Sequence, residues 1–451
     1  MNKNQKNNQT PTNVFYRSPV RRYPMIVRGE GIYLYDAEGK QIIDGTGGPF
    51  VVSIGHGVKE IRDAIYQQLE KIEFVHTLEF TTQVQEDLAK KVATLAPEKL
   101  DTSMFVPGGS DAVESSIKLA RQYHVETGNI QKYKVISLWP SYHGGTLGAL
   151  SITGAAKHRK YFLPLLKSHP KMPSAYCYRC YYKKNYPECG LICAHVLEKI
   201  IKQEGEETIS AFIAEPIGVF HSGVIIPPKE YFSIIREICT KHNILMICDE
   251  VVTGFGRTGK NFGIMNWGVV PDMITSGKGL SSGYAPIGVV IVHERIHDAI
   301  KKGTGWFAHG LTHMGSPVAC SAALAVLNYL ESNKLVSRVG EMGDYLKSRL
   351  NDILKYEIVG DIKGKGLLAS IEFVRDKASR EPFDNSIKLS ERMFNRAMDN
   401  GLYVKPESGF VDGTSGDCIM VGPPFITKKE EIDLICSKLS DTIAHVEREI
   451  Q

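Results

Sequence analysis

The chain has no apolar run that approaches membrane-spanning length; its longest apolar stretches are short and strand-like. Its charge is nearly balanced, with a net +4 over 451 residues, which is too mild to predict a nucleic-acid partner. The start, Met1 to Thr12, is polar and lacks the apolar core of a signal peptide, so we expect a frayed tail on a cytoplasmic protein. No internal repeat is visible. With 43% hydrophobic and 23% charged residues, the composition is that of an ordinary soluble globular enzyme or binding protein.

The nine cysteines divide into two groups. One group lies inside apolar segments, which indicates reduced, buried thiols (Cys239, Cys248, Cys320 and Cys436). The other group is clustered, with two-, eight- and three-residue gaps (Cys177, Cys180, Cys189 and Cys193). Four thiolates can bind zinc or an iron–sulfur cluster, but the span containing Pro187 is short, and disulfides are disfavoured in a cytoplasm. We therefore favour a solvated loop insertion with free thiols and expect no metal and no nucleic acid there.

The length suits one large domain and a smaller one. Short apolar runs alternate with helical patterns, which predicts an α/β fold with a largely parallel sheet covered on both faces. The predicted strands are Ser103–Val106, Lys134–Leu138, Ala211–Ala214, Ile244–Cys248, Met273–Thr275 and Ile287–Val292. Polar residues follow five of these strands, and ligands gather at the carboxyl ends of such strands.

The two ends of the chain have a different pattern from the middle. A hairpin is predicted around Glu38-Gly39-Lys40, and the last helix is expected to begin with a capping box of Thr427 and Glu430. We therefore predict that residues 1–65 join a smaller α+β domain formed by 330–451, and that residues 66–329 form the large domain.

Lys278 and Asp249 are the most informative pair of residues. Lys278 lies in a small-residue stretch just past an apolar strand, and Asp249 ends another strand. Pyridoxal phosphate chemistry needs a lysine that forms a Schiff base with the cofactor aldehyde and a carboxylate that keeps the pyridine nitrogen protonated. Neither residue alone would be informative, because most lysines in glycine-rich loops are simply solvated.

Three further segments fit the same cofactor. Gly109 and Ser110 open a helix, whose N-terminus attracts a phosphate. In isolation ordinary capping by Ser110 is the preferred explanation, but beside Lys278 and Asp249 the preference reverses. Tyr142 follows a strand and could stack on one face of a pyridine ring, and Val251 could cover the other face.

These residues carry a resemblance to the class-III aminotransferases, which are fold type I pyridoxal-phosphate enzymes. The matching signature runs from Ile247 to Gly259 and continues with Pro271-Asp272 and Ser276-Gly277-Lys278-Gly279. Shorter matches are Tyr142-His143-Gly144, Ala214-Glu215-Pro216 and His309-Gly310-Leu311-Thr312. The likeness extends from about Arg22 to the C-terminal helix. It implies a large, mostly parallel, seven-stranded sheet domain with a smaller α+β domain built from both chain ends.

The resemblance also implies roles for individual residues. Lys278 would be the Schiff-base lysine and proton shuttle, with Asp249 on the pyridinium. The cofactor-binding set would further include Gly109, Ser110, Tyr142, His143, Glu215 and Val251. Thr312 would reach the phosphate of a neighbouring subunit, which implies a homodimer, or a tetramer of such dimers, with shared active sites.

Two departures from the family pattern bear on the substrate. Relatives that bind the glutamate α-carboxylate usually carry an arginine where this chain has Met420, which favours pyruvate or another smaller acceptor over 2-oxoglutarate. Val252 stands where 4-aminobutyrate aminotransferases have glutamine, which favours ω-amino acids or primary amines as donors. The predicted function is thus amino transfer to a keto acid. A racemase or epimerase of the same family is the alternative, and a non-enzymatic metal or nucleic-acid binder is a weaker one.

Overall fold

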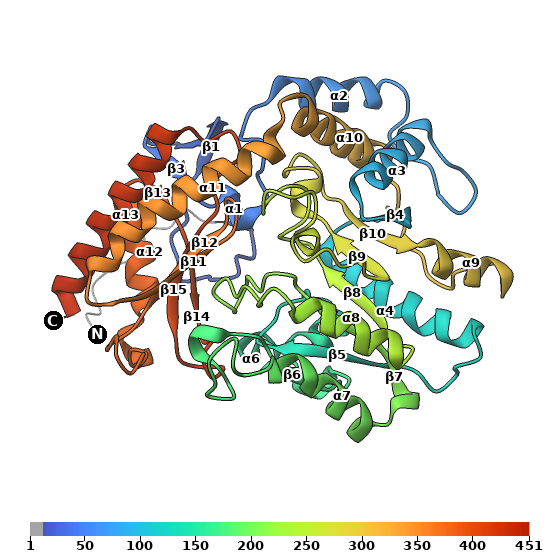
Figure 1. Cartoon of the computed structure of the whole chain (residues 1–451). Coiled ribbons are helices and arrows are strands. Elements are labelled where there is room, and N and C mark those ends of the chain that lie inside the picture. Colours follow the sequence, from blue (N-terminus) through green and yellow to red (C-terminus); the bar gives the residue numbers. More distant parts are fainter. Residues whose placement is uncertain (1–11, 451) are drawn as a thin grey trace.

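The structure, a computed structural model, describes residues 12–450. The predicted N-terminal tail therefore lies outside the described residues, apart from Thr12. Three sheets and the helices around them make up the molecule (Figure 1).

The central sheet has seven strands in the order β4-β10-β9-β8-β7-β5-β6. All neighbouring pairs are parallel except those of β10, which runs antiparallel to β4 and β9. The six predicted strands are confirmed, and the seventh was missed because its three residues contain no apolar run. The bounds are β4 Leu100–Val106, β5 Lys134–Trp139, β6 Lys171–Pro173, β7 Ile209–Ala214, β8 Leu245–Asp249, β9 Met273–Ser276 and β10 Gly288–His293.

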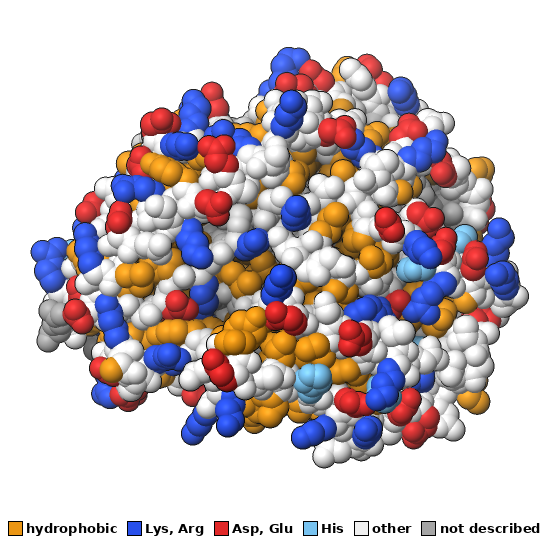
Figure 2. Space-filling model, viewed as in Figure 1, with side chains coloured by type: hydrophobic (Ala, Val, Ile, Leu, Met, Phe, Trp, Pro, Cys, Tyr) orange, Lys and Arg blue, Asp and Glu red, His pale blue; other side chains and the backbone are white. Residues whose placement is uncertain are grey.

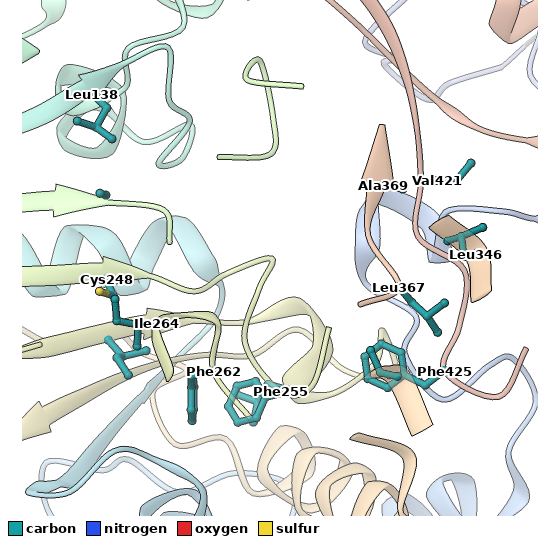
Figure 3. Close-up of a cluster of buried hydrophobic side chains, with 14 of the residues drawn as sticks. Leu138, Cys248, Phe255, Phe262, Ile264, Leu346, Leu367, Ala369, Val421 and Phe425 are labelled. Atoms are coloured by element: carbon teal, nitrogen blue, oxygen red, sulfur yellow. The ribbon is translucent and has the colours of Figure 1, made fainter. Parts of the chain in front are cut away.

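Helices cover both faces of this sheet because its strands are apolar on both sides. Along β8, Leu245 and Ile247 pack in the cluster that contains residues of α4 and α9, whereas Met246 and Cys248 pack in the cluster that contains residues of α7 and α8. Figure 3 shows Cys248 beside Ile264 and Phe262 in the second cluster. The helix bounds are α4 Gly109–Glu126, α5 Leu147–Ile152, α6 Ala156–Arg159, α7 Ile192–Glu204, α8 Tyr231–Lys241 and α9 Glu294–Lys302.

The predicted N-terminal hairpin is confirmed as β2 (Tyr33–Asp36) and β3 (Gln41–Asp44). It belongs to a four-stranded sheet in which β13 (Leu402–Tyr403) runs parallel to β3, so segments from both chain ends share one sheet. A third sheet has the order β11-β12-β15-β14, with bounds Val359–Gly364, Ala369–Phe373, Asp417–Val421 and Lys405–Ser408. The domain boundaries proposed from the sequence stay predictions.

The predicted C-terminal helix is confirmed as α13 (Lys429–Ile450), but its predicted cap is wrong. The Lys428 N–H donates to the Glu431 carboxylate at 2.8 Å, and the Thr427 hydroxyl instead donates to the Pro424 carbonyl at 2.6 Å. The capping interaction is therefore shifted by one residue along the chain. Only the bond from the backbone N–H to the acidic side chain is formed, and the reciprocal bond from a Ser or Thr side chain is missing. The remaining helices are α1 Gly47–Phe50, α2 Lys59–Leu69, α3 Gln83–Leu95, α10 Pro317–Ser332, α11 Leu335–Asn351 and α12 Leu389–Asp399.

Arg257, in the signature segment, is hydrogen-bonded to the C-terminal part of the chain. Its side chain is 1% exposed, and it donates to the carbonyls of Leu367, Gly422 and Pro423 at 2.7–3.1 Å. The guanidinium also lies 4.6 Å from the centre of the Phe425 ring. Because a buried charge is costly unless hydrogen-bonded, these carbonyls determine where the C-terminal segment can lie.

Acidic and basic side chains are interspersed over the face shown in Figure 2, in keeping with the small net charge. Among the described residues, no helix combines the length and apolarity needed to cross a membrane.

Candidate active site

A cavity of about 620 Å³ lies at the carboxyl ends of the central strands. It brings together most of the residues predicted from the sequence: Gly109, Ser110, Tyr142, His143, Glu215, Asp249, Val251 and Lys278. They come from the segments that follow β4, β5, β7, β8 and β9. The sheet topology thus gathers side chains that are up to 169 residues apart in sequence.

Lys278 follows β9 by two residues and has a left-handed φ of 39°. Its pKa is lowered to about 8 because burial disfavours the ammonium, a cost that the charges of Asp249 and Glu215 only partly offset. The ammonium lies 5.1 Å from the centre of the Phe220 ring, and within residues 12–450 it makes no hydrogen bond. A buried amine with this pKa can exchange a proton near neutral pH.

Asp249 is held on both of its oxygens. One accepts a hydrogen bond at 2.7 Å from Nδ1 of His143, and the other accepts from the Val251 N–H at 3.1 Å. Asp249 and His143 are each 3% exposed. The carboxylate is therefore oriented before any ligand binds, which is what a pyridinium partner requires.

The start of α4 is shaped to receive a phosphate. Gly108, not Ser110, occupies the cap position and makes no side-chain cap bond, so the capping explanation for Ser110 is wrong. The Ser110 hydroxyl instead accepts from the Gly145 N–H at 3.1 Å. A Cβ on Gly144 would lie 2.7 Å from that hydroxyl, and one on Gly109 would lie 3.0 Å from Val251. Both glycines therefore let Ser110 and Val251 lie close to the backbone, where a larger residue would displace them. The N-terminus of α4 beside them is a site that attracts a phosphate.

Glu215 lies close to Asp249 and Lys278. Its carboxylate accepts from the backbone N–H groups of Tyr142 at 3.3 Å and Val219 at 3.2 Å. Burial, and then the charge of Asp249, raise its pKa to about 8. At neutral pH the Asp249 carboxylate is therefore the principal negative charge at this end of the cavity.

Several residues singled out in the sequence do not line the cavity. Met420 is 0% exposed in β15 and packs in the apolar cluster that includes Phe50 and the cavity-lining Phe220. The acceptor preference expected from the missing arginine stays a prediction. Of the Gly45–Phe50 stretch, only Pro49 lines the cavity, and Trp139 lines a neighbouring one. Thr312 is in an exposed turn outside the cavity, and its predicted contact with a second subunit stays a prediction.

The clustered cysteines are all free thiols: Cys177 is exposed, Cys180 and Cys189 are half-buried and Cys193 is buried near the start of α7. Among residues 12–450, no group of three or more His, Cys, Asp or Glu side chains is arranged to hold a metal ion.

The far end of the cavity contains residues that the sequence analysis did not identify. Glu407 of β14 is 3% exposed and lies 2.9 Å from Lys405, 3.5 Å from Lys157 and 2.9 Å from His221. His221 in turn lies 2.5 Å from His158. These residues come from three separate segments and form no local motif, so no signal in the sequence could have linked them to the site.

A doubly covered α/β sheet with a lysine, an oriented aspartate and a phosphate-attracting helix N-terminus at its strand ends defines a pyridoxal-phosphate enzyme. Residues 16–443 match the aminotransferase class-III family, and the chain belongs to that family. It is an aminotransferase of fold type I, and its cofactor is pyridoxal 5′-phosphate.

Relatives agree over nearly the whole chain. The chain is 35% identical to an uncharacterized aminotransferase of Bacillus subtilis, over 95% of this chain and 97% of that protein. It is 36% identical to putrescine–pyruvate aminotransferase of Pseudomonas aeruginosa, over 91% and 88%. A solved amine transaminase from an uncultivated Pseudomonas species, in its PLP-bound form, superposes with a TM-score of 0.90 at 34% identity, covering 98% of this chain and 99% of that one.

Proposed function

We propose that this aminotransferase takes its amino group from an ω-amino acid and gives it to a small keto acid such as pyruvate. Bound pyridoxal phosphate supplies the carbonyl that captures the amine and the electron sink that makes the adjacent carbon acidic. The observation that carries the proposal is one cavity that is lined both by Lys278 and Asp249 and by the cations Arg17, Lys157 and Lys405.

The chain's own residues then have distinct tasks. Lys278 Nζ would take and later return the proton of the carbon that bears the amine, because its lowered pKa leaves a neutral fraction. Asp249 would keep the ring nitrogen protonated, and the His143 and Val251 contacts hold its carboxylate in place. Gly109 and Ser110 would bind the phosphate, and Tyr142 and Val251 would enclose the ring.

The opposite end of the cavity favours a carboxylate on the substrate. Arg17, Lys157 and Lys405 line it, and Glu407 is the carboxylate there that offsets them, so positive charge remains. Lys278 and Lys405 lie 5.1 and 5.8 Å from the centre of the same Phe220 ring, so their nitrogens are no farther apart than the sum of these distances. At about 1.2 Å of reach per single bond, a four-carbon ω-amino acid spans about 6 Å, which is within this upper limit.

The assembly and the compartment are proposed from Thr312 and from the cysteines. We propose a homodimer with shared sites because Thr312 lies in an exposed turn outside its own cavity. A cytoplasmic location is supported by nine free cysteines.

The proposal is tested with the purified holoenzyme and a panel of amines and ω-amino acids, without keto acid. We expect the visible spectrum to change to that of the pyridoxamine form, with one equivalent of carbonyl product for each active site. Butylamine is the control for 4-aminobutyrate because it lacks only the carboxylate. Loss of handedness in a chiral amino acid, with an unchanged cofactor spectrum, would instead establish a racemase.

Lys405→Met should raise KM for 4-aminobutyrate about ten-fold and leave KM for butylamine within about two-fold, because one charge-assisted contact is lost. Steady-state kinetics with pyruvate as acceptor measures both. Lys388→Met, which removes an exposed lysine outside the cavity, is the matched control. Equal changes for the two donors would contradict a contact with the carboxylate.

A further inference from the structure

A second cavity, of about 780 Å³, lies beside the active site. Two segments line both cavities. The segment after β5 contributes Trp139 to the second cavity and Tyr142 to the active site, and the segment that begins with β14 contributes residues 409–413 and Lys405 in the same way. Most of residues 177–185, in the loop with the clustered cysteines, also line the second cavity, although the proposed reaction does not use them.

The side chains that line this second cavity carry an excess of positive charge. Within residues 12–450, Asp412 is the one acidic residue among them, and its Oδ1 already accepts the backbone N–H groups of Thr414 at 2.8 Å and Ser415 at 2.6 Å. Five cations against this one acid leave an excess of +4, which equals the net charge of the entire chain. The five cations are Lys171, Arg179, Lys183, Lys184 and Arg380.

Two of these cations are held close together without being neutralised. The Arg179 guanidinium donates to the Arg380 carbonyl, and the Arg380 guanidinium donates in turn to the Tyr178 carbonyl. Glu372 accepts from Arg179 at 2.5 Å, but it also accepts from Lys363 at 2.7 Å. One carboxylate shared between two cations cannot offset both and the second arginine as well, so positive charge remains in this wall.

The other cations also lack acidic partners. The Lys171 ammonium donates to two backbone carbonyls at 3.0 and 3.3 Å and lies 5.4 Å from the centre of the Trp139 ring. Burial, and then the charge of Arg159, lower its pKa to about 8. Lys183 and Lys184 are exposed, and in the described part of the chain neither they nor Lys171 form an ion pair. Cations gathered in this way favour the binding of an anion with more than one charge.

An aromatic ring beside these cations can receive a flat group. Tyr181 lines the cavity and is 71% exposed. Cations already lie on the rings of Trp139 and Tyr178, but within residues 12–450 none lies on that of Tyr181. Its ring is therefore free to stack on a planar ligand. A cavity of this volume is large enough for a ligand that has both a ring and several charges.

We propose that the second cavity binds a nucleoside diphosphate, with its phosphates on Arg380, Lys183 and Lys184 and its base on Tyr181. Phosphate groups match guanidinium and ammonium donors, and two linked phosphates supply the multiple negative charges that this excess favours. A base stacks on an aromatic side chain whatever its hydrogen-bonding pattern, so the class of ligand is defined by charge and ring together. This site is separate from the reacting groups and does not depend on the identity of the amine donor.

Isothermal titration calorimetry of the enzyme loaded with pyridoxal phosphate tests the inference, with ADP, pyrophosphate and adenosine as probes. We expect one equivalent of ADP to bind per chain, at least about five-fold more tightly than pyrophosphate, because stacking of the base adds to the phosphate contacts. Adenosine, which lacks the phosphates, should not bind at about 1 mM. Equal affinities for ADP and pyrophosphate, or no binding of ADP at about 1 mM, would overturn the inference.

Two variants locate the ligand. Joint replacement by Lys183→Met and Lys184→Met should weaken ADP binding at least about ten-fold, and Tyr181→Leu should reduce the affinity for ADP to that for pyrophosphate. All three side chains are exposed, so folding should survive, which thermal unfolding checks. Lys405→Met, which removes a cation of the active-site cavity, is the matched control and should bind ADP like the wild type. Lost binding in Lys405→Met, or unchanged binding in the double variant, would place ADP elsewhere and refute the site.

Discussion

Lys278→Ala is expected to fold, to retain the cofactor weakly and to lose at least about a thousand-fold in turnover. The loss is large because both covalent attachment and proton transfer depend on one amine. Folding is expected to survive because the Lys278 ammonium makes no hydrogen bond within the described chain, and its removal relieves the burial of a cation.

The measurement is single-turnover conversion of the cofactor with 4-aminobutyrate, followed in the visible spectrum beside a thermal unfolding curve. Lys260→Ala, which removes an exposed lysine just after the first part of the signature, is the control. Wild-type rates in Lys278→Ala would refute the assignment of this lysine.

Asp249→Asn should cost about 10²- to 10⁴-fold in the rate of the half-reaction, because an amide cannot keep the ring nitrogen protonated. The substitution is nearly isosteric, and its oxygen can still accept from His143, so the arrangement around it is preserved. Asp249→Ala should lose at least as much. The same single-turnover assay measures both variants.

Glu215→Gln is the matched control for charge near Asp249. The Glu215 carboxyl has a pKa raised to about 8 and is mostly protonated at neutral pH. Replacing it with an amide therefore changes the charge of the site little. A mild effect of Asp249→Asn, comparable to that of Glu215→Gln, would mean that another group protonates the ring.

The sequence was sufficient to predict six of the seven strands of the central sheet. Strands such as Ile209–Ala214 are buried at every position, and a continuous apolar run is the pattern that a doubly covered parallel sheet imposes. The residues at the strand ends could be predicted for the same reason, since strand direction alone brings Asp249 and Lys278 together. The family signature added their roles.

The substrate end of the cavity could not be predicted in this way. His158, His221 and Glu407 come from a four-residue helix, a loop and a short edge strand, and only tertiary packing brings them into contact. Met420 lies directly opposite the cavity-lining Lys405 in the β14–β15 pair, so the two side chains share one face of the sheet. The sequence showed that an arginine is missing at this position, but not that a lysine from the neighbouring strand lies beside it.

The hydrogen bonds from Arg257 to the C-terminal segment have a consequence for synthesis of the enzyme. Its carbonyl partners lie 110 to 166 residues downstream, so a partially synthesised chain holds an arginine that cannot yet be buried with its hydrogen bonds. The parallel pairing of β3 with β13 likewise waits for residues 402–403. Contacts of such long sequence separation form slowly and late. The catalytic pocket is therefore completed only after the C-terminal segment has been synthesised. Nascent or C-terminally truncated chains should depend on chaperones.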